Sequence, residues 1–267
     1  MTGLLIVVLL SVAVLAWAVH LGLHVDPENA PSGSPAWQGP DAAALDAALT
    51  DHVQGIGDDP APTRTAELDE LAAHHAFDMA TRNFDSETTP EGETLEARRT
   101  RLHPKLVGEI AQWQAVGDVD AAVADATRVL DGVLGAGAGD LLRASLDGPE
   151  VGEIGIGAAV ERGRVGLCVV MMSRWATLDD TAPPPAHDGW TFRGELGRWT
   201  AAADLQARFR VADRPWSDAV TAEPEDQGAT APGDPDRFRV TVPVAPDATA
   251  VEVQFLRKGV HGRVRGA

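Results

Sequence analysis

An uncharged apolar segment near the amino terminus constrains this chain more than any other feature of its sequence. Residues 3–23 contain no Asp, Glu, Lys or Arg, and a helix of this length spans the roughly 30 Å hydrocarbon core of a bilayer. Only the α-amino group is positive before the segment, whereas Asp26 and Glu28 follow it. This asymmetry favours an amino terminus on the inside. We therefore expect a transmembrane signal anchor over residues 1–25, with the rest of the chain extracytoplasmic.

A cleaved signal peptide is the alternative for the same segment. Ala16-Trp17-Ala18 fits a small-x-small cleavage site that follows an apolar stretch. However, no charged region precedes the apolar run, and the run continues to Leu23, so the uncleaved anchor is favoured. Both interpretations export the remainder of the chain, and the anchor makes this a single-pass protein of the cell membrane.

The composition describes an acidic protein with few cysteines. The chain has 40 Asp and Glu against 22 Lys and Arg, which gives a formal net charge of −18. Nucleic acid repels such a polyanion, so we exclude it as the main partner. A lysine-poor acidic chain is typical of salt-loving archaea, in which salt screens the self-repulsion, and an actinobacterial source is the alternative. The single cysteine, Cys168, excludes an internal disulfide framework, and we expect it to be buried.

The apolar periodicity predicts an α+β chain with two exported domains. A Pro-, Gly- and Ser-rich linker covers residues 26–40, and a Pro-rich linker covers residues 177–188. Between the linkers, helical patterns occur at 41–54, 65–82 and 118–134, and strands at 152–157 and 164–172. After the second linker, period-two alternation predicts strands at 190–196, 204–211, 237–244 and 250–256. We therefore expect one domain over residues 41–176 and an all-β sandwich domain over residues 189–267.

Four short stretches in the first domain occur together in a characteristic order. They are LAAHHAFDMATRNF at 71–84, Phe84-x-Ser86-x-x-x-Pro90-x-Gly92, Gly108-Glu109-Ile110 and Gly155-Ile156-Gly157. In this order and spacing they resemble the CAP superfamily (cysteine-rich secretory, antigen 5 and pathogenesis-related 1 proteins), in a form that suits a haloarchaeal source. The resemblance covers residues 41–175 and implies an α-β-α sandwich.

The departures from the family pattern indicate a degenerate site. Glu87 stands where the resemblance implies a first His, and no His occurs in the stretch around Asp140 where it implies a second. The candidate cleft therefore consists of Glu87, Glu109, Ser86 and Asp140. Carboxylates without imidazole suit hard oxygen-ligated cations rather than zinc. We expect no metal, no cofactor and no catalytic residue, and the alternative is Glu87 and Glu109 acting as acid and base.

Three further groups of residues have two interpretations each. His75 falls on the apolar stripe of its helix and suits the core, whereas His74 faces solvent, and a metal site on this helix is disfavoured. Trp190, Trp199 and Trp216 suit either carbohydrate stacking or interior packing, and packing is favoured. A basic carboxyl terminus is a candidate partner contact, through residues Arg257, Lys258, Arg263 and Arg265.

These observations favour a membrane-anchored extracytoplasmic binding or assembly protein with a non-catalytic CAP-like domain. Its partners would be the membrane, through residues 3–23, and a protein or cell-surface component. Two alternatives remain open at this point. One is a hydrolase that uses Glu87 and Glu109 with a hard divalent cation. The other is an accessory subunit of a membrane protein complex.

Overall fold

The computed structural model describes most of the chain after residue 39. The described residues are 40–56, 61–119, 123, 125–146, 151–180, 189–198, 200–211, 214–225, 236–244, 248 and 251–258. Within these ranges, none of the helices combines the length and the apolar character that a membrane crossing requires. The anchor expected over residues 1–25 lies outside the described residues, as does most of both linkers.

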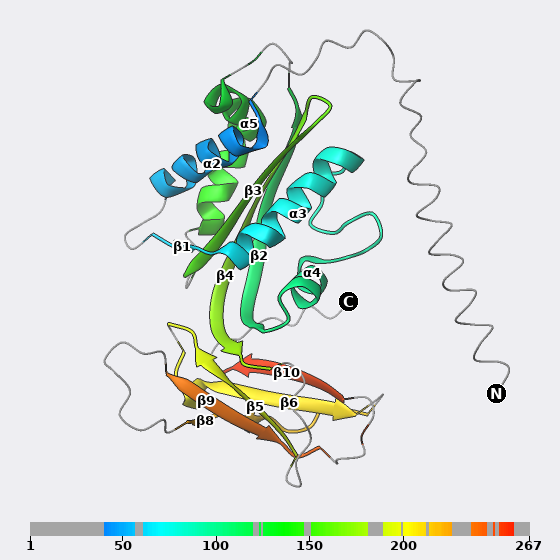
Figure 1. The fold of residues 1–267 in the computed structure, drawn as a ribbon, viewed down its shortest axis with the longest axis vertical. Helices are drawn as coiled ribbons and strands as arrows, with labels where there is room; N and C mark the ends of the chain where they lie inside the picture. The colour runs from blue at the N-terminus through cyan, green and yellow to red at the C-terminus, as the bar shows by residue number, and fades with distance from the viewer. Residues whose placement is uncertain are drawn as a thin grey trace, which may run out of the picture. The chain divides into compact units, whose positions relative to one another are not determined.

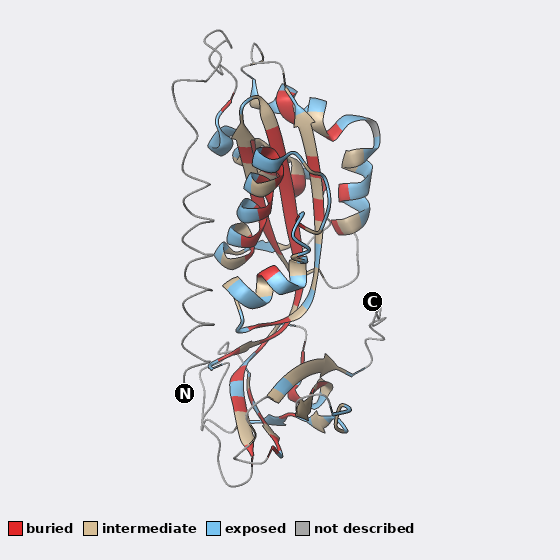
Figure 2. Cartoon of the chain, turned by 90° about the vertical axis from the view of Figure 1, so that its right-hand side faces the viewer, coloured by how far each residue is buried: buried red, intermediate tan, exposed pale blue. Residues whose placement is uncertain are grey.

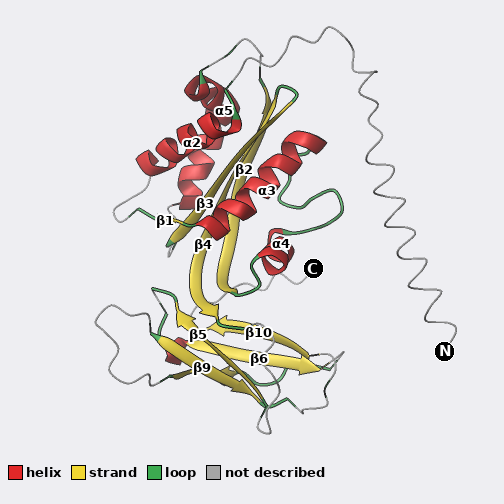
Figure 3. Cartoon of the chain, in the orientation of Figure 1, coloured by secondary structure: helices red, strands yellow, loops and turns green. Residues whose placement is uncertain are grey.

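The first half of the described chain is a sheet with helices on both faces (Figures 1 and 3). In chain order its elements are α2 (Ala42–Ile56), β1 (Thr63–Arg64), α3 (Ala66–Arg82), α4 (Leu95–Leu102), β2 (Leu106–Asp118), α5 (Ala126–Leu146), β3 (Glu153–Glu161) and β4 (Arg164–Leu178). Strand β4 lies between β2 and β3 and is antiparallel to both, and β1 adds in parallel to β3. The expected mixed α+β class is confirmed.

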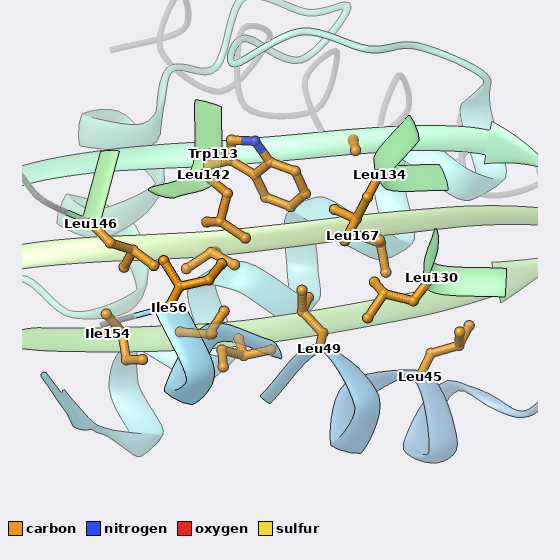
Figure 4. Close-up of a cluster of buried hydrophobic side chains, with 14 of the residues drawn as sticks. Leu45, Leu49, Ile56, Trp113, Leu130, Leu134, Leu142, Leu146, Ile154 and Leu167 are labelled. Atoms are coloured by element: carbon orange, nitrogen blue, oxygen red, sulfur yellow. The ribbon is translucent and has the colours of Figure 1, made fainter. Parts of the chain in front are cut away.

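Side chains of β4 alternate between two separate cores. Leu167, Val169 and Met171 pack with α2 and α5, in the cluster that Figure 4 draws. Cys168 and Val170 pack on the opposite face, under α3. The strand is buried along most of its length, which Figure 2 shows as a red band through the sheet. The continuous apolar run at residues 164–172 therefore has the burial expected of a central strand covered on both faces.

Glycines allow α3 to lie directly on the sheet. A Cβ added to Gly155 would stand 1.9 Å from the Leu68 carbonyl carbon, and one added to Gly157 would stand 2.3 Å from the Ala73 nitrogen. Gly166 on β4 makes a similar approach to Ala76. The Gly-Ile-Gly stretch is thus explained by the close approach of backbone to backbone, and no phosphate or other ligand is needed to account for it.

The second half adds strands to the same sheet and builds a second one. Its elements are β5 (Trp190–Leu196), η2 (Ala202–Asp204), β6 (Leu205–Val211), β7 (Val220–Thr221), β8 (Glu223–Pro224), β9 (Arg237–Val242) and β10 (Val251–Arg257). Strand β5 pairs with the end of β4, and β9 and β8 follow it, whereas β10, β6 and β7 form a separate three-stranded sheet.

The two β layers of the second half share a core with the end of β4. Phe192 on β5 meets Phe255 on β10 edge to face, with ring centroids 5.7 Å apart. Trp175 and Ala176 of β4 belong to the same buried cluster. Trp37–Ala267 accordingly forms one compact unit. The two halves on either side of the boundary expected within residues 177–188 are joined by β4, which pairs with strands of both.

The helix expected at residues 118–134 is displaced. The structure instead has β2 running to Asp118 and α5 covering Ala126–Leu146, so the helix continues through the glycine-rich stretch 135–139. Gly135 and Gly137 have positive φ angles of 49° and 116°, and each glycine costs a helix about 1 kcal/mol. Leucines at both ends of α5 are nevertheless buried in one core, and burial of each contributes about 1.5–3 kcal/mol. Tertiary packing therefore outweighs the local breaking signal.

Candidate functional site

The described residues form a groove of about 1080 Å³. One wall consists of α4 and the first half of β2, and the other consists of β10 with Trp190 and Trp216. Seven consecutive residues of each strand line it, Leu106–Gln112 of β2 and Val251–Arg257 of β10. Because successive side chains of a strand point to opposite faces, an unbroken run of lining residues means that the groove follows the edge of each strand.

Both strands are outermost in their sheets. Strand β2 pairs with β4 alone, and β10 pairs with β6 alone, among the strands that the structure describes. Their other edges carry main-chain N–H and C=O groups that no described strand uses, which is the arrangement that invites pairing with a further strand. The groove therefore lies between two open strand edges.

The structure brings two of the four candidate cleft residues to this groove. Glu87 and Glu109 both line it, and both are exposed. Ser86 and Asp140 are not among its lining residues. The Ser86 hydroxyl accepts from the Thr88 N–H at 3.2 Å, and Asp140 lies on α5, the helix that packs on the other core.

Glu87 and Glu109 stand on different sides of β2. Successive side chains of β2 point to opposite faces of the sheet. Ile110 and Gln112 share one face, and Glu109 points from the other. The Gln112 amide, in turn, lies 3.5 Å from the Glu87 carbonyl oxygen. Glu87 is thus placed beside the face of β2 away from Glu109, an arrangement that does not suit a cooperating acid and base pair.

A buried polar network holds the loop that carries Glu87. Arg98 on α4 is only 2% exposed; its Nη1 donates to His75 Nδ1 at 2.6 Å and its Nη2 to Gln112 Oε1 at 2.9 Å. A guanidinium has no acceptor, so His75 Nδ1 must accept, and its Nε2–H donates to the Ser86 carbonyl at 2.9 Å. The network therefore fixes one tautomer and joins α3, α4, β2 and the intervening loop.

The network also keeps His75 neutral. Burial and the neighbouring Arg98 charge lower the pKa of His75 from its ordinary value of 6.5 to about 4. Burial likewise lowers the pKa of Arg98. His75 is fully buried and holds both ring nitrogens in hydrogen bonds, so it takes a structural role. His74 is exposed, as the helical pattern predicts.

Other candidate nucleophiles and ligand groups lie outside the groove. Cys168 is fully buried, and burial raises the pKa of its thiol to about 12, so the reactive thiolate is suppressed. The expectation of a buried cysteine is confirmed. In the part of the chain that the structure describes, no three His, Cys, Asp or Glu side chains gather in a way that could hold a metal ion.

Three tryptophans border the groove. Trp190 and Trp216 line it together with Trp175, and Trp199 is not a described residue. The Trp216 ring lies 4.9 Å from the guanidinium carbons of both Arg208 and Arg210. Trp175 is 9% exposed, and the indole N–H groups of Trp175 and Trp190 are buried without an acceptor among the described residues. Packing accounts for most of this indole surface, but those two donors stay unsatisfied.

Half of the predicted basic contact can be placed. Arg257 ends β10 and lines the groove, and the Lys258 N–H donates to the Asp204 carbonyl at 2.7 Å. Arg263 and Arg265 lie outside the described residues. Sequence reasoning missed Trp175, because only strand pairing and burial reveal its position.

Comparisons with known proteins give partial likenesses among solved structures alone. No protein-family model and no curated protein matches the chain. Among solved structures, it is similar to an extracellular protein containing an SCP domain from Bacillus anthracis str. Ames, with 20% sequence identity and a TM-score of 0.31. The match covers 45% of this chain and 40% of that chain, so it spans less than half of either protein. The haloarchaeal source stays a prediction.

Proposed function

We propose that this chain is a membrane-anchored extracytoplasmic protein that binds or assembles with a partner through a degenerate CAP-like domain. The observation that carries the proposal is the make-up of the groove. Its lining contains carboxylates, guanidinium groups, amides and indoles, but no Ser, His or Cys. Such a surface offers contacts for recognition and lacks an activated nucleophile with its base.

Placement of the nearby reactive groups supports a binding role. Cys168 is buried beneath α3 and His75 is committed to Arg98 and Ser86. Glu87 and Glu109 lack a positioned imidazole and stand on different sides of β2. Each of these potential catalytic residues is thus either buried or lacks a partner residue for catalysis.

The CAP-like assignment rests on sequence stretches that now have places in the fold. Residues 71–82 of the first stretch lie in α3, Gly108-Glu109-Ile110 lies in β2, and Gly155-Ile156-Gly157 lies in β3. Strands β2 and β3 belong to one sheet, and α3 covers one of its faces. A sheet with helices on both faces is the arrangement that the resemblance implies. Shared architecture alone does not carry function, so the proposal stands on the groove.

Membrane anchoring is tested on cells that produce the full chain with a carboxyl-terminal epitope. We expect the protein to stay in the membrane pellet after alkaline carbonate extraction, and protease added to intact cells to remove the epitope. Release by carbonate, or an epitope that protease reaches only after lysis, contradicts the proposal. The mass of the purified chain distinguishes an intact anchor from cleavage after Ala18.

The non-catalytic role is tested with the full chain in detergent. We expect no turnover of ester or peptide substrates, with Ca²⁺ or Mg²⁺ added, above that of the double variant Glu87→Gln/Glu109→Gln. Turnover that the double variant abolishes would establish the hydrolase alternative. Gentle detergent extraction followed by mass spectrometry addresses the complex-subunit alternative, which requires a partner in fixed stoichiometry.

A further inference from the structure

The hydrogen bonds of β6 reveal which groups of β10 face the groove. Leu205 and Phe209 direct their carbonyl oxygens toward β7 and its flanking residues, whereas the Asp204 carbonyl accepts from the Lys258 N–H at 2.7 Å. Main-chain groups of an antiparallel strand alternate between its two sides. Even-numbered residues of β6 therefore face β10, and odd-numbered residues face β7.

The register between the two strands then assigns the free groups. Gln206, Arg208 and Arg210 pair with Leu256, Gln254 and Glu252. The even-numbered residues of β10 are thus used by β6. The main-chain N–H and C=O groups of Val251, Val253 and Phe255 point to the open edge, where the groove lies.

The edge of β2 across the groove is less available. The Lys105 carbonyl accepts from the Leu178 N–H on the β4 side at 2.9 Å, so the next residue, Leu106, directs its main chain outward. Arg99 on α4 already donates to the Leu106 carbonyl. Helix α4 therefore takes up part of the β2 edge, and β10 is the better receptor for an added strand.

The charges around the groove favour a basic ligand. Four carboxylates and two guanidinium groups are among its lining residues. Two of the carboxylates are already paired, Glu96 with Arg99 and Glu252 with Arg210. Glu87 and Glu109 have no ion pair to another described residue, so their charges are available to a cation on a ligand.

Two indole donors near the groove are unsatisfied. Trp175 is more than nine-tenths buried, lines the groove and lacks an acceptor for its N–H among the described residues, as does the Trp190 N–H. A buried donor without a partner costs about 1–3 kcal/mol. Both donors are closed off from the groove, so the inference below rests on the open edge of β10 and on the charges.

We infer that the groove binds an extended, basic peptide segment of a partner protein, which adds as a strand to the open edge of β10. The inference rests on the binding role proposed above and names the chemistry of the partner. Main-chain hydrogen bonds to Val251, Val253 and Phe255 would supply affinity, and Glu87 and Glu109 would select for Lys or Arg.

The test uses the full chain in detergent and a labelled peptide of about eight residues in which valine and lysine alternate. Its matched comparison peptide alternates valine and glutamate. We expect the lysine peptide to bind about tenfold more tightly at low salt, as fluorescence anisotropy measures it. The double variant Glu87→Gln/Glu109→Gln should remove most of that preference.

Two changes probe the main-chain pairing itself. Val253→Pro removes an outward N–H while leaving the β6 pairing intact, since proline is tolerated on an edge strand whose N–H faces outward. Val253→Ala is its control, because it trims the side chain and keeps the N–H. We expect Val253→Pro to weaken lysine-peptide binding about tenfold and Val253→Ala to change it less than about threefold. N-methylation of alternate peptide bonds should weaken binding similarly, with the protein unchanged.

Three results overturn the inference. They are equal affinity for the glutamate peptide, equal binding by Val253→Pro and Val253→Ala with similar melting temperatures, and full binding of the N-methylated peptide. The N-methylated peptide decides the case if Val253→Pro melts early. Failure of the proposed function is read separately, from carbonate release or from turnover that depends on Glu87 and Glu109.

Discussion

The two faces of the central sheet are covered by helices in different ways, although both rest on the same strands. Under α2 and α5 the core is apolar, and leucines such as Leu49 and Leu142 fill the space between helix and sheet. Under α3 the backbones nearly touch, and a polar network of His75, Arg98 and Gln112 closes the far side. We therefore expect the first arrangement to tolerate changes of side-chain shape, and the second to depend on close backbone contact and on its hydrogen bonds.

The largest expected effect comes from adding one methyl group under α3. Gly157→Ala places a Cβ 2.3 Å from the Ala73 nitrogen, so α3 must move away, and we expect a loss of about 3 kcal/mol or more in the free energy of unfolding. Gly132→Ala on α5 is the control, since its Cβ would meet nothing within 4 Å. That variant should gain up to about 1 kcal/mol in denaturant unfolding. Equal effects of the two variants would contradict the comparison.

The next effect tests the polar network. Arg98→Met removes the donor to both His75 and Gln112 and leaves the His75 Nδ1 acceptor buried without a partner, so we expect a loss of about 2–4 kcal/mol. His75→Leu in the same chain should add much less than it costs alone, which gives a coupling of at least about 1 kcal/mol in a double-mutant cycle. Purely additive losses in urea unfolding would show that the network does not act as a unit.

The dependence of unfolding stability on pH gives a smaller effect, which should differ between variants on the two faces of the sheet. The pKa of His75 is about 4 in the folded chain against 6.5 ordinarily, so only the unfolded chain takes up the proton as the pH falls below 6.5. Stability should be full above that pH and decline toward pH 4, by on the order of 2 kcal/mol. His75→Gln should flatten this decline. Leu142→Ala should lower stability at every pH and leave the decline between pH 6.5 and pH 4 unchanged. An unchanged profile in His75→Gln is the contrary result.

The smallest effect concerns an exposed arginine near the same network. Arg82 on α3 pairs with Asp78 at 3.1 Å and with Glu91, and exposed pairs of this kind contribute less than about 1 kcal/mol. We expect Arg82→Gln to cost that little at low salt and nothing at about 1 M salt, because salt screens exposed charges. The cost of Arg98→Met should persist in salt. Melting temperatures of both variants across a salt series give the answer.

Short-range patterns predicted some parts of the fold well. Alternating residues such as Phe238 and Val240 identified β9, and the apolar stripe of α3 placed His75 inward and His74 outward. Strand β2 escaped detection because its Glu109, Gln112 and Gln114 are interspersed with apolar residues on an open edge. The predicted bounds of α5 were wrong because its glycines at 135–139 are typical of a helix end, whereas packing of its leucines in the core stabilises the helix.

The candidate site was only half accessible to sequence reasoning. Glu87 and Glu109 could be named from a resemblance, and both line the groove. The groove itself depends on β10 standing opposite β2, and about half of the chain separates the two strands. Pairing between distant segments is decided by the assembled core, so the open edges and the unsatisfied donors of Trp175 and Trp190 emerge only from the fold.

The position of β4 has a consequence for the time course of synthesis. Strand β2 has no other described partner, and β3 otherwise has only the two residues of β1. Most of the sheet therefore cannot assemble until residues 164–178 have been synthesised, at which point two thirds of the chain has been made. Until then, the apolar stripe of α3 with Leu68, Leu71 and Met79 lacks the part of its packing surface that β4 supplies. The nascent chain thus carries an apolar helix face that stays partly uncovered until this single strand has been made.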